Sequence, residues 1–140
     1  MAEQPLFLDT NIWLRFFTRD DPARAEACRQ LFERAAQGDL RLTTNEMVLA
    51  ELEWTLRSYY KVPKPAVVER LSAVLGTPSL QLPRRALVEA ALSLYDRPNV
   101  DYVDAYNAAD LQARGLTTIA SYDSDFDRLG VKRVEPSLDA

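Results

Sequence analysis

PLFLDT, residues 5–10, is a short apolar run that ends in an aspartate and a threonine. Such a run is typical of a buried strand in a parallel sheet, and it places Asp9 at the carboxyl end of that strand. A second stretch of this kind, LTTIAS (116–121), precedes Asp123. Strand-like runs alternate with helical patterns between the two. The alternation predicts an α/β fold with a mostly parallel sheet that helices cover on both faces.

Helix boundaries are indicated by residues that start or stop helices. Asp21 and Pro22 suit the cap and first turn of a helix, and Gly38 and Gly115 suit helix ends. No repeat or change in composition marks a second domain, so residues 1–140 are predicted to form a single domain. We expect strands at 5–10, 40–44, 79–82, 116–121 and 131–134, and helices at 11–17, 21–37, 45–60, 65–75, 84–95, 103–114 and 123–129.

The composition excludes several classes of mechanism. The 140 residues include no histidine, which rules out catalytic triads, Cys-His pairs and histidine-bound zinc. Cys28 is the only cysteine and cannot form an internal disulfide, which favours a reducing cytoplasm. No apolar stretch approaches the roughly 20 residues that span a bilayer, and the N-terminus does not resemble a signal peptide, so we expect no membrane partner.

The net charge of −4 makes the chain a poor electrostatic match for nucleic acid unless a metal or a basic patch offsets the repulsion. Asp9 and Asp123 follow strands, and parallel sheets place ligand sites at such ends. Either aspartate could instead simply cap the helix that follows it. Asp104 begins an i, i+4, i+7 row with Ala108 and Leu111 near a helix start, where favourable interaction with the helix dipole is the alternative.

Glu51 is placed by the helical wheel. It lies about 160° from Glu53, from roughly 100° per residue, and is predicted to face the sheet while Glu53 faces water. A carboxylate on an inner face is costly unless it is paired, for example with an arginine, or bound to a metal. The predicted inner side also carries Met47, Val48, Trp54 and Thr55, and the predicted outer side carries Arg57 and Tyr60.

A shared metal ion would explain these carboxylates together. Four carboxylates close to one another raise each other's pKa values, and a bound cation relieves that repulsion. Ligands that are all oxygen favour Mg²⁺, with Mn²⁺ as a substitute, over zinc or copper. The predicted metal-binding and catalytic residues are Asp9, Glu51, Asp104 and Asp123, with Asp101 as an alternative near Asp104.

Four motifs resemble those of the PIN-domain family, and within it the VapC-type toxins of toxin–antitoxin pairs. They follow the family's order and cover nearly the whole chain. LDTN alone would be a weak signal, whereas all four in order are a specific one. The motifs are FLDTNIWLRFF (7–17), TTNEMVLAELEWTL (43–56), DYVDAYNAADLQARG (101–115) and IASYDSDFDRLG (119–130).

The resemblance implies a three-layer α/β/α sandwich and Mg²⁺-dependent cleavage of RNA. It assigns the metal ligands to the same four carboxylates and makes Asp125 a possible auxiliary ligand. Asn11 is expected to orient Asp9 or contact the substrate, or else to cap a helix. Ser121 stands where the family often has threonine, which keeps the hydroxyl group. The family also implies a homodimer and inhibition by an antitoxin.

Two other classes of function stay open from the sequence. One is a PIN-fold module that binds RNA or protein without catalysis, although all four ligands are present. The other is an aspartate-dependent phosphatase, but such enzymes need a second aspartate two residues after the first, and that position is Asn11. A receiver domain is disfavoured because its acidic pair and late lysine are not matched in order.

Overall fold

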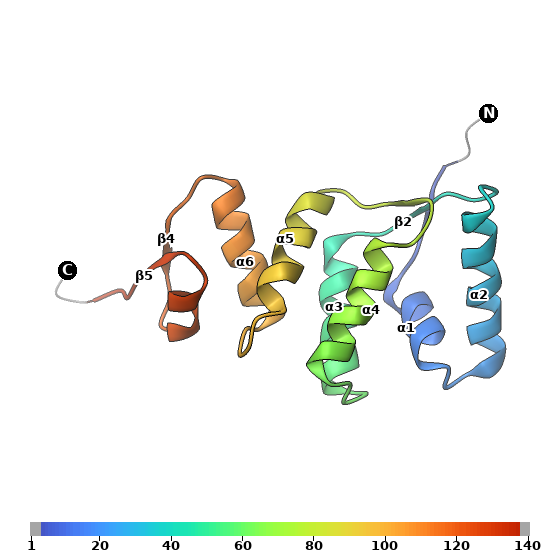
Figure 1. The fold of residues 1–140 in the computed structure, drawn as a ribbon, viewed down its shortest axis with the longest axis horizontal. Helices are drawn as coiled ribbons and strands as arrows, with labels where there is room; N and C mark the ends of the chain where they lie inside the picture. The colour runs from blue at the N-terminus through green and yellow to red at the C-terminus, as the bar shows by residue number, and fades with distance from the viewer. Residues whose placement is uncertain (1–3, 138–140) are drawn as a thin grey trace. The chain divides into compact units, whose positions relative to one another are not determined.

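The computed structural model describes residues 4–137 and divides the chain into two compact units (Figure 1). Unit 1 ends at Arg85 and unit 2 begins at Ala86. Each unit has its own helices and its own parallel strands. The prediction that the whole chain forms a single domain is a statement about both units together and stays a prediction.

Unit 1 contains a three-stranded parallel sheet with the strand order β1-β2-β3. Each strand has two residues, fewer than predicted, although backbone hydrogen bonds continue the pairing just beyond the strands. For example, Leu8 N donates to Thr43 O at 2.9 Å just beyond β1. The elements of the unit are β1 (Leu6–Phe7), α1 (Thr10–Thr18), α2 (Pro22–Ala36), β2 (Leu42–Thr43), α3 (Glu46–Ser58), α4 (Lys64–Leu75) and β3 (Leu80–Gln81).

The helices of unit 1 begin where the sequence predicts. Asp21 caps α2 by accepting a hydrogen bond from Arg24 N at 3.2 Å, and Asn45 caps α3 by accepting one from Val48 N at 3.0 Å. These bonds satisfy N–H groups that have no partner within the first turn. Beyond the end of α2, Gly38 adopts a φ of 84°, a conformation that a residue with a Cβ atom rarely takes.

The core of unit 1 lies where the helices meet. Helix α1 packs against α2 and α3, and α3 packs against α4, as the blue to green helices of Figure 1 show. Trp13 of α1 is buried and its ring centroid lies 5.0 Å from that of Phe32 in α2. Cys28 is buried in α2 as well, and burial raises the pKa of its thiol.

Unit 2 contains one parallel strand pair, β4 with β5, and the short 3-10 helix η1 between them. Tyr95 and Tyr102 are buried and their rings meet edge to face at 5.4 Å. Gly130, with a φ of 76°, leads into the last strand. The elements are α5 (Arg85–Tyr95, which begins at the last residue of unit 1), α6 (Tyr102–Ala113), β4 (Thr118–Ala120), η1 (Ser124–Arg128) and β5 (Lys132–Val134).

The predicted α/β class with parallel strands is confirmed. Every strand pair in residues 4–137 is parallel, and helices separate the strands along the chain. The helices predicted from periodicity are all present, and their bounds differ by a few residues at most from those expected. Within the same residues, no helix combines the length and apolar character that crossing a bilayer demands.

Candidate metal site

Three carboxylates of unit 2 come together at the start of α6 and in η1. Asp104 lies in the first turn of α6, Asp123 is the cap of η1, and Asp125 lies within η1. One carboxylate oxygen from each lies within 4.8 Å of the others. The sequence predicted Asp104 and Asp123 as ligands and Asp125 as auxiliary, and the structure brings these three into one cluster, called here the acidic triad.

Hydrogen bonds between side chains and backbone hold the strand-to-helix turn that presents Asp123. Its Oδ1 accepts a hydrogen bond from Asp125 N at 2.8 Å, and its own N–H donates to Ser121 Oγ at 3.0 Å. Ser121 N in turn donates to Val134 O at 3.0 Å, next to the β4–β5 pair. The hydroxyl of Ser121 therefore supports the turn that carries Asp123, in addition to any contact with substrate.

Burial and negative neighbours raise the pKa of Asp104. Burial is the larger cause, because it penalises the charged form, and the charges of Asp123, Asp101 and Asp125 add to it. Contact with Asp123 acts in the same direction. A cation in the triad would remove this penalty, because it stabilises the ionised carboxylates that the protein alone holds at a cost.

Asp125 differs from the other two members of the triad because an arginine holds it. Arg128 Nη2 donates to Asp125 Oδ1 at 2.6 Å and also to Asn99 O at 3.0 Å. The guanidinium balances the charge of Asp125, whereas the structure shows Asp104 beside negative groups. Sequence reasoning missed Arg128, although an arginine three residues after an aspartate on a helix is a recognisable pairing signal.

Asp9 and Glu51 lie in unit 1, and Thr10 donates a hydrogen bond to each of them. Asp9 is exposed and caps α1, and its Oδ1 accepts a hydrogen bond from Thr10 N at 2.8 Å. The hydroxyl of buried Thr10 donates a hydrogen bond to Glu51 Oε1 on α3. Capping and ligation are therefore not exclusive for Asp9, because its second oxygen is not used by the cap.

The orientation predicted for α3 is wrong. Glu51 is exposed and Glu53 is buried, the reverse of the expected arrangement. The helix buries an aliphatic row at spacings of three and four, and Glu53 lies beside that row with Oε2 2.8 Å from Arg57 Nε. The helical wheel separates the two glutamates, but Met47 and Trp54, which it predicts on the inner side, are both exposed. The buried row consists of Val48, Leu49, Leu52 and Leu56.

Asn11 and Asp101 are also clarified. Asn11 is exposed inside α1, and the cap of that helix is Asp9, so Asn11 does not cap it. Asp101 precedes α6 as its cap residue but its side chain makes no capping hydrogen bond. The carboxylate of Asp101 acts on Asp104 through charge, whereas Asp104 belongs to the triad.

The oxygen atoms of the triad fit a hard divalent cation. Three carboxylates at this spacing and no nitrogen or sulfur donor are the ligand set that Mg²⁺ or Mn²⁺ takes. Burial is the larger cause of the raised pKa of Asp104, and the part that comes from the neighbouring carboxylates is repulsion that an ion would offset. Convergence of Asp9 and Glu51 on the same ion involves both units and stays a prediction.

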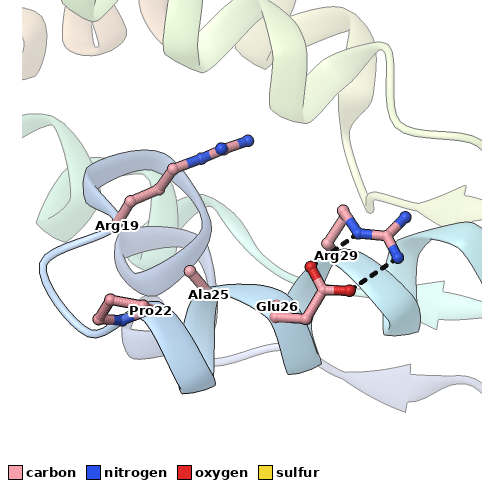
Figure 2. A pocket seen from close by; sticks show the side chains of 5 residues that line it. All are labelled: Arg19, Pro22, Ala25, Glu26 and Arg29. Atoms are coloured by element: carbon pink, nitrogen blue, oxygen red, sulfur yellow. Dashed lines mark hydrogen bonds and ion pairs between the residues drawn. The ribbon is translucent and has the colours of Figure 1, made fainter.

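A pocket of about 240 Å³ in unit 1 has a different character. Figure 2 shows Glu26 in it joined by hydrogen bonds to Arg29, which lowers the pKa of Glu26 to about 2. The carboxylate is thus already neutralised by a guanidinium, and none of the predicted site residues lines the pocket. Its lining is Arg19, Pro22, Ala25, Glu26 and Arg29.

Comparisons with known proteins support the family resemblance of the motifs. The family model described as PIN domain matches residues 6–132, across both units. A VapC ribonuclease of Aquifex aeolicus is 25% identical over 129 residues, covering 92% of this chain and 95% of the relative. Ribonuclease VapC23 of Mycobacterium tuberculosis is 29% identical over 120 residues, covering 84% and 92%.

A solved structure was also found among the similar proteins. It is that of VapC20 from Mycobacterium tuberculosis, described as a sarcin-ricin loop cleaving toxin. The match covers 94% of this chain and 99% of that one, with 23% identity and a TM-score of 0.41. A superposition at that level is too loose to compare individual side chains, so the family rests on the sequence match.

Proposed function

This chain belongs to the PIN-domain family, and from that we propose that it is a metal-dependent endoribonuclease that hydrolyses phosphodiester bonds in RNA. The observation that carries the proposal is the acidic triad, because it forms from the two family motifs of unit 2. The names of the curated relatives, both ribonucleases, support the choice of RNA as substrate.

The proposed ligands of the ion are Asp9, Glu51, Asp104 and Asp123, with Asp125 as auxiliary. Mg²⁺ is the proposed ion and Mn²⁺ its substitute, because the donors are all carboxylate oxygens. When bound, the ion activates water and offsets the negative charge that develops on the attacked phosphate. The excess of acidic residues then does not oppose RNA binding, since the ion offsets the charge of the acidic cluster where RNA must approach.

The protein groups supply the proton chemistry. The chain has no histidine, and the proposed base that takes the proton from the attacking water is a carboxylate. The oxygen of water then forms the new bond to phosphorus, the bond to the 3′ oxygen breaks, and that oxygen takes up a proton from solvent. The products are a 5′-phosphate and a 3′-hydroxyl, and attack by the RNA's own 2′-hydroxyl, which would leave a cyclic phosphate, is not used.

The same family membership leads us to propose the biological setting. We propose that the chain is the toxin of a toxin–antitoxin pair in the cytoplasm, that it acts as a homodimer, and that a cognate antitoxin inhibits it. The similarity to VapC ribonucleases supports the toxin role. A free thiol at Cys28 suits a reducing compartment.

Mapping of cut RNA ends tests the activity. Purified protein is incubated with total RNA and Mg²⁺, and fragments that carry a 5′-phosphate are ligated to an adapter and sequenced. We expect discrete cut sites with the wild type and none with Asp9→Asn, which keeps the size of the side chain. Fragments with a 2′,3′-cyclic phosphate would contradict the proposed chemistry.

The binding-module alternative is separated by the same preparation. A catalytically silent PIN module would retain RNA in a gel-shift assay without cutting it in Mg²⁺ or Mn²⁺, and Asp9→Asn would change nothing. Phosphatase activity would appear as phosphate release from a generic aryl phosphate. Growth arrest on expression of the wild type, with normal growth on expression of Asp9→Asn, would support the toxin role and the nuclease together.

A further inference from the structure

Thr10, Thr44 and Glu53 are the buried polar or charged side chains of residues 4–137. Burying a hydroxyl is costly unless it is hydrogen-bonded. Glu53 is bonded to Arg57 within α3. The two threonines instead make their bonds beside the candidate ligands Asp9 and Glu51, and their position is not explained by the packing of the core alone.

Thr10 contacts both candidate ligands of unit 1. Its backbone N–H donates to Asp9 Oδ1 at 2.8 Å, and its hydroxyl donates to Glu51 Oε1. Only 3% of Thr10 is exposed, so packing holds the hydroxyl in place. Glu51 itself is exposed. Without this bond its carboxylate would sample several rotamers, and ordering such a side chain costs conformational entropy.

Thr44 secures the strand that leads to Asp9. Its hydroxyl donates to Leu8 O at 3.1 Å, and both residues are buried. The backbone N–H of Thr44 also donates to Gln81 O at 3.4 Å. Thr44, just beyond β2, therefore connects the residue that follows β1 to the end of β3. The position of Asp9 therefore depends on a buried side-chain bond as well as on the short ladder of the sheet.

We propose that Thr10 is a positioning residue that orients the Glu51 carboxylate for metal binding, and that Thr44 supports the adjacent strand end. This proposal rests on the proposed function and goes beyond it, because it concerns a side chain outside the proposed set of metal ligands. A ligand that its surroundings already hold in place needs less ordering when the ion binds. The hydroxyl donor is the required feature, so a serine at position 10 should retain the positioning of Glu51 and a valine should not.

The test compares Thr10→Ser, Thr10→Val and Thr10→Ala. Loss of an outer partner of a metal ligand typically costs roughly 10–100-fold in metal affinity or activity. We expect a loss in that range for Thr10→Val, seen in kcat and in Mn²⁺ affinity and little in KM for RNA, and near wild-type values for Thr10→Ser. Thr10→Ala serves if valine, which is similar in size but apolar, prevents folding.

Thr18→Val is the matched control on the same helix. Thr18 also has a hydroxyl with partners, since its Oγ1 lies 2.7 Å from Leu14 O and 2.9 Å from Asp20 Oδ1 and can donate to either, at the opposite end of α1. Its loss should lower the melting temperature without changing kcat or Mn²⁺ affinity. If Thr18→Val and Thr10→Val lose kcat and affinity equally, the effect is general damage to α1 and the proposal is overturned.

A double-mutant cycle in EDTA tests the bond without metal or catalysis. The free energy of unfolding is measured for the wild type, Thr10→Val, Glu51→Ala and the double variant. Coupled residues give non-additive effects, so we expect Thr10→Val to cost less when Glu51 is already alanine. If the changes in the free energy of unfolding are additive, the hydroxyl does not hold Glu51 and the proposal is wrong.

The two levels of proposal fail in different ways. If the wild type cuts no RNA with either ion, the proposed function fails, while the EDTA cycle still decides whether Thr10 holds Glu51. If the wild type cuts RNA and Thr10→Val or Thr10→Ala matches it in kcat and Mn²⁺ affinity, the nuclease stands and the positioning role is wrong.

Discussion

Glu51 and Glu53, two residues apart on α3, have opposite surroundings: Glu51 is exposed and accepts a hydrogen bond from Thr10, whereas Glu53 is buried and paired with Arg57. One helix thus carries an exposed glutamate, which we propose as a metal ligand, and a buried one that lies beside the packed aliphatic row. The two residues provide a matched comparison of function with stability, because the same substitution can be made at both.

Glu51→Ala and Glu53→Ala are expected to separate the two roles. Glu51→Ala should abolish RNA cleavage and lower the free energy of unfolding less than Glu53→Ala does, because Glu51 is exposed and its substitution removes the hydrogen bond from Thr10 but no buried charge. Glu53→Ala should lower that free energy by about 1.5–3 kcal/mol, as expected for a lost hydrogen bond to a charged group, and retain cleavage. Urea unfolding and RNA cleavage below the unfolding transition measure both. The reverse pattern would contradict the assignment.

Asp125 should matter less for cleavage than Asp104. Arg128 already balances the charge of Asp125, so that carboxylate contributes less to holding a cation. We expect Asp125→Asn to lower kcat by roughly the 10–100-fold typical of an outer partner, and Asp104→Asn to lower it further. Single-turnover cleavage at saturating Mg²⁺ compares the two. A greater loss with Asp125→Asn would make Asp125 a principal ligand.

The raised pKa of Asp104 predicts the pH dependence of stability without metal. The folded protein holds the Asp104 proton more tightly than the unfolded chain does. The stabilisation is therefore fully present below the unfolded pKa, near 3.8, and is lost as the pH rises through the higher folded value. In EDTA, Asp104→Asn should remove this decline. Urea unfolding across mildly acidic pH measures it, and an unchanged decline in the variant would assign it elsewhere.

Metal should reverse that penalty. Bound Mg²⁺ or Mn²⁺ requires ionised carboxylates. The affinity of the protein for the metal ion should therefore fall as the pH is lowered toward the raised pKa of Asp104. Binding to the folded state alone stabilises it by about 2.7 kcal/mol when the ion is present at 100 times its Kd. We expect the melting temperature to rise with millimolar Mn²⁺ in the wild type and much less in Asp123→Asn. Equal shifts in both proteins would place the ion elsewhere.

The sequence predicted the elements better than it predicted which way their side chains face. Caps such as Asp21 and Asn45 and a stop such as Gly38 act within a few residues, so they can be recognised locally. The side of α3 that is buried depends on which apolar row the rest of unit 1 covers. The aliphatic row that includes Leu52 is buried, whereas Met47 and Trp54 are exposed, and tertiary packing determines which row is covered.

The charged residues of the acidic triad could be predicted from the sequence, whereas the hydrogen bonds that support the candidate ligands could not. Asp104, Asp123 and Asp125 follow from motifs and strand ends, and the structure brings them together. The bond from Thr10 to Glu51 joins residues 41 positions apart, so no local pattern reveals it. A threonine between two motif residues could have been noticed, but its partner depends on how α1 packs on α3.

The buried thiol of Cys28 can report on local unfolding of the protein around α2. The thiol is 7% exposed and its raised pKa keeps it in the unreactive protonated form in the native state. A thiol-specific reagent should therefore modify the protein only when local unfolding separates α2 from its neighbours. The modification rate would then report how often this opening occurs. Because the chain has a single cysteine, mass spectrometry of the intact protein could follow this kinetics with no engineered label.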